Sequence, residues 1–250
     1  MRRLSFALLL SCAIGVGASA SASAQNYGVS FENPSLGGGW RGLYGGVHLG
    51  GTWGSTNAYD SGGSNTLDDY WSAAPSGVVA GGQLGYNWVT GPVLYGVEGD
   101  IGYLGLAGSA TTAYVPFGYD SSTQTDLDFY MTLRGRLGIV ANSWLFYATG
   151  GYIGADTTVS IVEGCDSFLC GGPFVVGGSK SGFRSGWTLG GGLEGELSDR
   201  WTAKIEYLYY DLGSTNITTT AGGTSSRWTL DTDGSLVRAG LNYRFTMPGF

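Results

Sequence analysis

Short and long gaps alternate regularly between eight strand-like stretches of this chain. Within each stretch apolar and polar residues alternate, which is the period-two pattern of a strand with two different faces. The gaps 89–92, 141–143 and 198–200 are short, whereas the others are long and rich in Gly, Ser, Thr, Asp and Asn. The stretches cover residues 41–53, 77–88, 93–103, 126–140, 144–155, 184–197, 201–211 and 235–245, and the long gaps cover about 54–76, 104–125, 156–183 and 212–234.

This rhythm predicts an all-β fold, an eight-stranded antiparallel transmembrane β-barrel. Such barrels have short periplasmic turns at one end and long extracellular loops at the other. Each stretch has about the 9–11 residues that a tilted strand needs to cross a bilayer. A soluble β-sandwich would space its turns more evenly. An even number of strands also places both ends of the barrel on the periplasmic side.

The two faces of the stretches carry different chemistry. In 93–103, Val97 and Ile101 share one face, and Glu98 and Asp100 share the other. No helical segment is available to cover eight apolar strand faces. Closing the sheet with its apolar face towards lipid satisfies the backbone without leaving an edge. By the same alternation, Leu127 lies with Phe129, Met131 and Leu133 on the lipid face and Asp128 with Tyr130, Thr132 and Arg134 in the lumen, whereas 144–155 is apolar on both faces and its parity stays open.

The composition agrees with a sheet between lipid and a lumen. Charged residues make up 12% of the chain, about half the usual fraction, and aromatic residues make up 14%. The 47 glycines lack the period of collagen, and those inside strands suit the curvature of a small barrel. Aromatic residues gather near the ends of the stretches, which predicts girdles at both membrane interfaces: Trp40, Trp53, Trp88, Tyr103, Trp144, Trp187, Trp201 and Tyr243.

The first 24 residues read as a secretory signal peptide. Arg2 and Arg3 precede an apolar run over 4–16, which is shorter than the ~20 residues of a spanning helix, and Ala22-Ser23-Ala24 offers a cleavage site. Lipoprotein processing at Cys12 is the weaker interpretation, because Cys12 comes very early. We therefore expect a signal peptide at 1–24, a periplasmic segment at 25–40, the barrel at 41–245 and a tail at 246–250.

Charge, cysteine and histidine content narrow the function classes. The full chain has a net charge of −7, and the loss of the leader arginines makes it more acidic, which argues against nucleic acid as a partner. Cys165 and Cys170 are expected to form a loop disulfide in an oxidising compartment. The only histidine, His48, is expected in the lumen with Tyr44; without a visible partner it is a weak catalytic candidate. We expect no enzyme activity, no metal and no cofactor.

The charged residues of the strands predict an ionic network inside the barrel. An eight-stranded lumen is only wide enough for side chains to fill it, and charges buried there must be paired. We expect Glu98 or Asp100 to pair with Arg134 or Arg136, and Glu206 to pair with Arg238 or Arg244. A thin hydrated channel with the same lining is the alternative. The predicted network comprises Glu98, Asp100, Arg134, Arg136, Glu194, Glu196, Lys204, Glu206, Arg238 and Arg244.

Several motifs resemble one known family. The segments GWTLGGGLEG at 186–195 and LSDRWTAKIEYLYYDLG at 197–213 form one hairpin, accompanied by GLYGGV at 42–47, YATGG at 147–151 and VRAGLNYRF at 237–245. Together they resemble the alphaproteobacterial "porin family" surface antigens, which are OmpA-like outer-membrane barrels. The resemblance implies insertion by the outer-membrane assembly machinery, which would read Tyr243 and Phe245 as its signal. Because residues 246–250 follow, Phe250 is the alternative signal.

These observations predict a structural protein of the Gram-negative outer membrane that supports envelope integrity. Its partners would be outer-membrane lipid and lipopolysaccharide. A surface-binding protein is the alternative, either an adhesin or a haem- or ligand-binding platform, because the long gaps hold aromatic and acidic residues. The absence of histidine from those gaps weakens haem binding. A narrow pore and a lipid-modifying enzyme that uses His48 are further alternatives.

Overall fold

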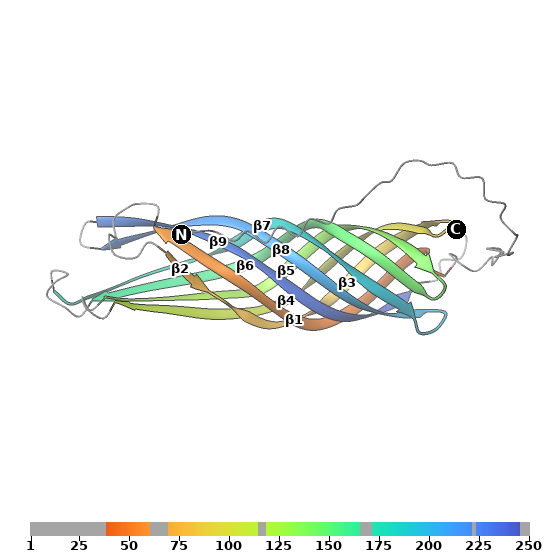
Figure 1. Cartoon of the computed structure of the whole chain (residues 1–250), viewed down its shortest axis with the longest axis horizontal. Coiled ribbons are helices and arrows are strands. Elements are labelled where there is room, and N and C mark those ends of the chain that lie inside the picture. The colour runs from red at the N-terminus through yellow and green to blue at the C-terminus, as the bar shows by residue number, and fades with distance from the viewer. Residues whose placement is uncertain (1–38, 61–69, 115–118, 166–171, 222–223, 246–250) are drawn as a thin grey trace, which may run out of the picture. The chain divides into compact units, whose positions relative to one another are not determined.

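A computed structural model describes residues 39–60, 70–114, 119–165, 172–221 and 224–245 of the chain. The described part consists of β-strands that form one sheet (Figure 1). It contains no helix that is long and apolar enough to cross a membrane. The strands are β1 (Gly42–Asp60), β2 (Tyr70–Ala73), β3 (Ser76–Thr90), β4 (Val93–Tyr114), β5 (Tyr119–Ala141), β6 (Trp144–Cys165), β7 (Phe174–Glu196), β8 (Trp201–Ala221) and β9 (Thr224–Arg244).

The sheet closes on itself, which confirms the predicted antiparallel barrel. Neighbouring strands pair in chain order, and β1 also pairs with β9, from Tyr44 opposite Arg244 to Asp60 opposite Trp228. Closure removes the edges that an open sheet would expose. In Figure 1 the strands cross the barrel axis at a steep tilt, as closure of a small barrel requires.

The closed barrel has the eight strands predicted, and one short additional strand, β2, is present because one strand is interrupted. The short strand β2 pairs with the same neighbour, β1, as β3 does, with Ala73 opposite Thr56 and Ser76 opposite Trp53. Pro75 lies between β2 and β3 and has no N–H to donate to a ladder; its carbonyl still accepts from the amide of Gly54 at 2.9 Å. The barrel wall therefore has eight strand positions, and one of them is divided into β2 and β3 near Pro75.

Most of the residues predicted as long loops continue the strands. β4, β6, β7 and β8 run ten residues or so beyond the predicted ends, and in Figure 1 these extensions reach past the body of the barrel. The extensions of β4, β6 and β8 each contain at least two threonines, a residue that favours strands. The connections at the other end are short, as predicted: Gly91 and Asn142 adopt positive φ values of 58° and 54° in two of the turns. We call this end the short-turn end.

The outer face of the barrel is apolar. Large side chains such as Leu133 (64% exposed), Val47 (63%) and Ile205 (63%) point away from the lumen on strands β5, β1 and β8. So much exposed apolar surface is untenable in water and marks contact with lipid. The alternation also settles the parity of β6, where Leu145 and Tyr147 are buried, and Trp144 and Phe146 are exposed.

Aromatic rings form a belt at each end of this apolar band. At the short-turn end Trp88 stacks on Tyr95 at 5.8 Å between ring centroids, and Trp201 meets Tyr243 at 5.1 Å. At the other end Trp187 contacts Tyr209 at 5.5 Å. Between the belts lie the membrane-spanning segments. Trp40 is a correction to the predicted girdles, because it is only 3% exposed and packs inside the barrel.

A β-bulge overturns part of the predicted alternation in β5. The register between β5 and β6 shifts between Leu127 and Tyr130. Because a bulge adds one residue to a strand, side chains beyond it change face. Leu127 is therefore buried in the lumen and Asp128 is exposed, the reverse of the predicted assignment.

Candidate functional site

Eight charged side chains meet in the middle of the barrel lumen. They project from five strands, because each occupies an inward position of the two-residue strand period. Four are acidic and four are basic, so the cluster is neutral overall, and their side chains are at most 4% exposed. We call this cluster the ionic layer: Glu98 and Asp100 on β4, Arg134 and Arg136 on β5, Glu194 on β7, Lys204 and Glu206 on β8, and Arg238 on β9.

Glu98 lies at the centre of the ionic layer. It forms an ion pair with Arg134 from the adjacent strand. The Lys204 ammonium lies 2.9 and 3.0 Å from its two oxygens, and the Tyr44 hydroxyl donates to it at 2.8 Å. Arg136 adds a longer contact of 3.5 Å. These donors occupy both carboxylate oxygens, which is the condition for burying a charge.

A second group of pairs links the ionic layer both between adjacent strands and across the lumen. Arg238 lies 2.6 Å from Glu206 and 3.1 Å from Asp100. Arg134 lies 2.8 Å from Asp100 and 3.2 Å from Glu206, so both guanidinium groups bridge the same two carboxylates. Planar guanidinium groups with several donors suit such shared pairing better than an ammonium.

The part of the ionic layer nearer the short-turn end is built around Arg136. Its guanidinium lies 2.7 Å from Glu194 and 4.1 Å from the centroid of the Tyr147 ring. Glu194 also accepts from the Thr202 hydroxyl at 2.5 Å and from the Asn242 amide at 2.8 Å.

His48 sits at the boundary of the ionic layer, as a hydrogen-bonding lumen residue. Its Nδ1 lies 2.5 Å from the Gln83 side-chain oxygen, and its Nε2 lies 2.6 Å from the Tyr130 hydroxyl and 3.3 Å from Arg238. These neighbours orient the ring, and none of them is a serine that a histidine could activate. The geometry gives no support to the lipid-modifying enzyme considered above.

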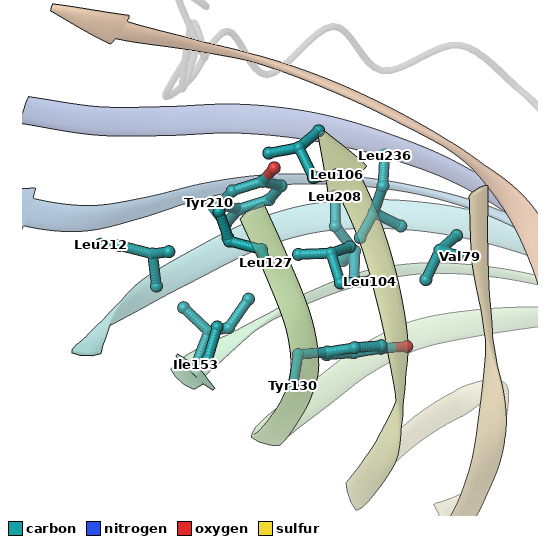
Figure 2. Close-up of a cluster of buried hydrophobic side chains, with 11 residues drawn as sticks. Val79, Leu104, Leu106, Leu127, Tyr130, Ile153, Leu208, Tyr210, Leu212 and Leu236 are labelled. Carbon is teal, nitrogen blue, oxygen red and sulfur yellow. The ribbon is translucent and has the colours of Figure 1, made fainter. Parts of the chain in front are cut away.

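An apolar layer fills the lumen above the ionic layer, towards the long strand extensions (Figure 2). The charged residues alone did not predict it. The signal was present, however, because Leu208 and Leu236 continue the inward alternation of Glu206 and Arg238. Tyr130 joins the two layers, since its ring is buried in the apolar layer and its hydroxyl accepts from Arg238 at 3.1 Å. The layer comprises Val79, Leu104, Leu106, Leu127, Tyr130, Ile153, Ala155, Leu208, Tyr210, Leu212 and Leu236.

A smaller apolar cluster lies at the short-turn end of the lumen. Trp40, which precedes β1, packs there against Leu94, Val140, Leu145 and Tyr147. The Arg244 guanidinium lies 5.4 Å from the Trp40 ring. We call this cluster the Trp40 cap; it would have been hard to foresee, because Trp40 lies outside the strand pattern.

Two of the ten predicted network residues stand apart. Glu196 and Arg244 pair with each other at 2.6 Å near the rim of the short-turn end, where they are partly exposed. The remaining eight meet in the ionic layer, and the expected neighbours Glu98 and Arg134, and Glu206 and Arg238, lie side by side.

The other predicted site residues lie near the strand ends. Cys170 lies outside the described residues, so the expected pairing with Cys165, at the end of β6, stays a prediction. Tyr243 and Phe245 contact each other at 5.3 Å between ring centroids on the outer face at the end of β9.

In the described residues, the ionic layer, the apolar layer and the Trp40 cap place buried side chains along the lumen. The charges in the middle are paired, and the side chains on either side are mostly apolar, with tyrosine hydroxyls that are themselves hydrogen-bonded. A ligand in this lumen would have to displace side chains that are already partnered. The arrangement therefore suits a rigid spanning element.

The outer membrane protein beta-barrel domain family matches residues 6–245 of this chain. The 25 kDa outer-membrane immunogenic protein of Brucella abortus is 31% identical over 206 residues, which cover 82% of this chain and 79% of that protein. The 31 kDa outer-membrane immunogenic protein of Brucella melitensis is 30% identical over 221 residues, covering 82% and 84%. A 22 kDa outer membrane protein of Rhizobium leguminosarum is 30% identical, covering 66% of each.

The fold also matches a solved structure. The outer membrane protein OprG from Pseudomonas aeruginosa superposes with a TM-score of 0.53 and 13% sequence identity, over 83% of this chain and 97% of that chain. At this identity the match concerns the fold alone. It agrees with the closed barrel of the described residues.

Proposed function

Because this chain belongs to the outer membrane protein beta-barrel domain family, we propose that it is a structural outer-membrane protein with a sealed lumen. It strengthens the envelope and presents its long strand extensions at the cell surface. The observation that carries this proposal is the neutral ionic layer, in which four acids and four bases are buried and paired. Such a layer stiffens a wall and blocks a channel.

The proposal that the strand extensions lie at the cell surface rests on which end of the barrel carries the short turns. The short turns of outer-membrane barrels face the periplasm, and their longer hairpins face outward. The extensions of β4 to β9 lie on the hairpin side. Relatives are named outer-membrane immunogenic proteins, which agrees with a place in the outer membrane.

Planar-bilayer recording tests the sealed lumen. We expect the refolded mature chain to give no stable conductance steps above a detergent-only control. The variant E206A/R238A empties part of the ionic layer without changing the net charge, and we expect it to stay closed because the apolar layer remains. Large, stable conductance of the unaltered protein would overturn the proposal.

A cellular experiment tests the structural role. We expect cells that lack this protein to become sensitive to detergent and to recover when the full chain is restored. A variant with the hairpin 214–231 shortened by equal lengths on both arms should restore resistance as well as the full chain does, because the spanning segments carry this role. Unchanged detergent resistance of the deletion strain would contradict an envelope function.

A further inference from the structure

The wall of the barrel is open between β7 and β8 above the membrane. The two strands pair only from Glu196 opposite Thr202 up to Trp187 opposite Asp211. Beyond that point β7 continues to Phe174 along β6, and β8 continues to Ala221 along β9. In Figure 1 the far ends of β8 and β9 lie apart from those of β6 and β7. Unpaired edges are tolerated here because water can reach them outside the hydrocarbon region.

A bend in β8 lies beside this opening. The register of β8 shifts between Asp211 and Ser214, and Gly213 there has a φ of 65°, a left-handed conformation that favours glycine. The Asp211 carboxylate accepts from the Gly213 amide at 2.7 Å and holds the bend. This bend follows directly after Asp211, the last residue of β8 that pairs with β7, so it lies where the gap begins.

A cavity of about 190 Å³ occupies the gap. Arg184 and Lys180 face it from the inner side of β7, whereas Phe183 faces it from the outer, lipid side. Residues from both faces of one strand can line one cavity only where that strand has an open edge. Val159 and Leu230 complete an apolar wall. The cavity is therefore amphiphilic, and it can be entered from the side.

The two cations of this cavity donate only to neutral acceptors, while the carboxylates of Asp231 and Asp211 act on Arg184 from a longer distance. Arg184 is 9% exposed and donates to the Thr232 hydroxyl at 2.9 Å and to the carbonyl oxygens of Gly213 and Leu230. The Lys180 ammonium donates to the Asn216 carbonyl at 3.0 Å. Within the described ranges no carboxylate forms an ion pair with either cation. The arginines of the ionic layer differ in this respect, because each of them forms an ion pair with a carboxylate.

We propose that this gap binds the phosphate headgroup of an acylated lipid of the outer leaflet. Arg184 and Lys180 would hold the phosphate, since both are charged donors that match its oxygens. Phe183, Val159 and Leu230 would pack against the first part of an acyl chain. The cavity lies just beyond the belt of Trp187 and Tyr209, at the depth of lipid headgroups. The inference is independent of the sealed lumen, because the gap lies above the ionic layer.

Native mass spectrometry of the full mature barrel in detergent tests this inference. The probes are phosphatidic acid, phosphatidylcholine of the same chain length, and inorganic phosphate. We expect the barrel to retain phosphatidic acid in preference to phosphatidylcholine, and an equal concentration of inorganic phosphate not to displace it. Equal retention of the two lipids would overturn the site, and displacement by inorganic phosphate would overturn its assignment to a lipid.

Variants separate binding from structure. K180Q alters an exposed side chain and should lower retention of phosphatidic acid about tenfold, as the loss of a charged hydrogen bond implies. R184Q should have at least that effect, and R184K, which keeps the charge, should recover part of it. R41Q removes an exposed cation at the short-turn end and should change nothing. If Lys180 and Arg184 only tie the strands together, K180Q and R184Q will retain lipid as the unaltered barrel does, and the proposal fails.

Discussion

Glu206 and Arg238 face each other directly on neighbouring strands, and the Arg238 Nε donates to the Glu206 carboxylate at 2.8 Å. Glu98 and Arg134 are likewise directly opposite each other on β4 and β5, and so are Glu194 and Lys204 on β7 and β8. The ionic layer is therefore assembled from opposite charges at cross-strand positions, the contacts that stabilise sheets. Its remaining contacts are diagonal ones between adjacent strands, such as Arg134 with Asp100, and contacts across the lumen, such as Arg238 with Asp100.

Removing Arg134 should destabilise the barrel strongly. Arg134→Met leaves Glu98, Asp100 and Glu206 short of a partner, and breaking a buried ion pair costs about 3–5 kcal/mol. Urea titration in lipid vesicles, followed by heat-modifiable gel migration, measures the free energy of unfolding. The neutral double variant E98Q/R134M should lose less than the sum of its two single variants. Strict additivity of the two losses would show that the pair is not coupled.

The apolar layer predicts a contrast between two leucines. Leu208 is 1% exposed inside the lumen, whereas Leu189 is 59% exposed towards lipid. Leu208→Ala should cost about 2–5 kcal/mol, because it leaves a cavity among packed side chains. Leu189→Ala should cost clearly less, because lipid tails are as apolar as leucine and fill the space. The same unfolding measurement applies, and equal losses would refute the assignment of the two faces.

An outward aspartate beyond the membrane-spanning segments predicts a pH dependence. Burial, together with the neighbouring Asp211 and Asp231, raises the pKa of the Asp233 carboxyl. A raised pKa in the folded state means that ionisation opposes folding, so this carboxyl lowers stability as the pH rises through that pKa. The stability difference between Asp233→Asn and the unaltered protein should therefore grow in favour of the variant from pH 4 to pH 8. Asp199→Asn, on an exposed short turn, serves as the control, and an unchanged difference over this range would contradict the prediction.

Much of the barrel could be predicted because its faces follow a two-residue period. Glu98 and Arg134 fall on inward positions of adjacent stretches, so their meeting follows from strand order and short turns. The strand extensions could not be predicted from composition, because residues such as those of 212–221 resemble a loop in isolation. They form strands because β8 and β9 pair with each other beyond the membrane.

The parts that were missed depend on single residues. One bulge moves Leu127 into the lumen, and no alternation pattern marks where an extra residue is inserted. Trp40 enters the lumen from a segment outside the strands, which only the folded barrel can accommodate. The opening beside β7 begins where Gly213 adopts a left-handed conformation. In the sequence, nothing distinguishes this glycine from the other glycines of the motif.

Gly213 and Gly182 allow that opening to be tested with a matched pair of substitutions. A Cβ added at either position meets nothing within 4 Å, so the two sites differ in backbone conformation and not in space. Gly213→Ala should cost about 1–2 kcal/mol, the penalty of a left-handed conformation for an L-residue, and Gly182→Ala should cost little. Relief of this strain would straighten β8 towards β7, so Gly213→Ala should also slow amide hydrogen exchange along β7 between 174 and 186 and weaken retention of phosphatidic acid. If the two alanine variants match each other in stability and exchange, the bend at Gly213 does not hold the wall open.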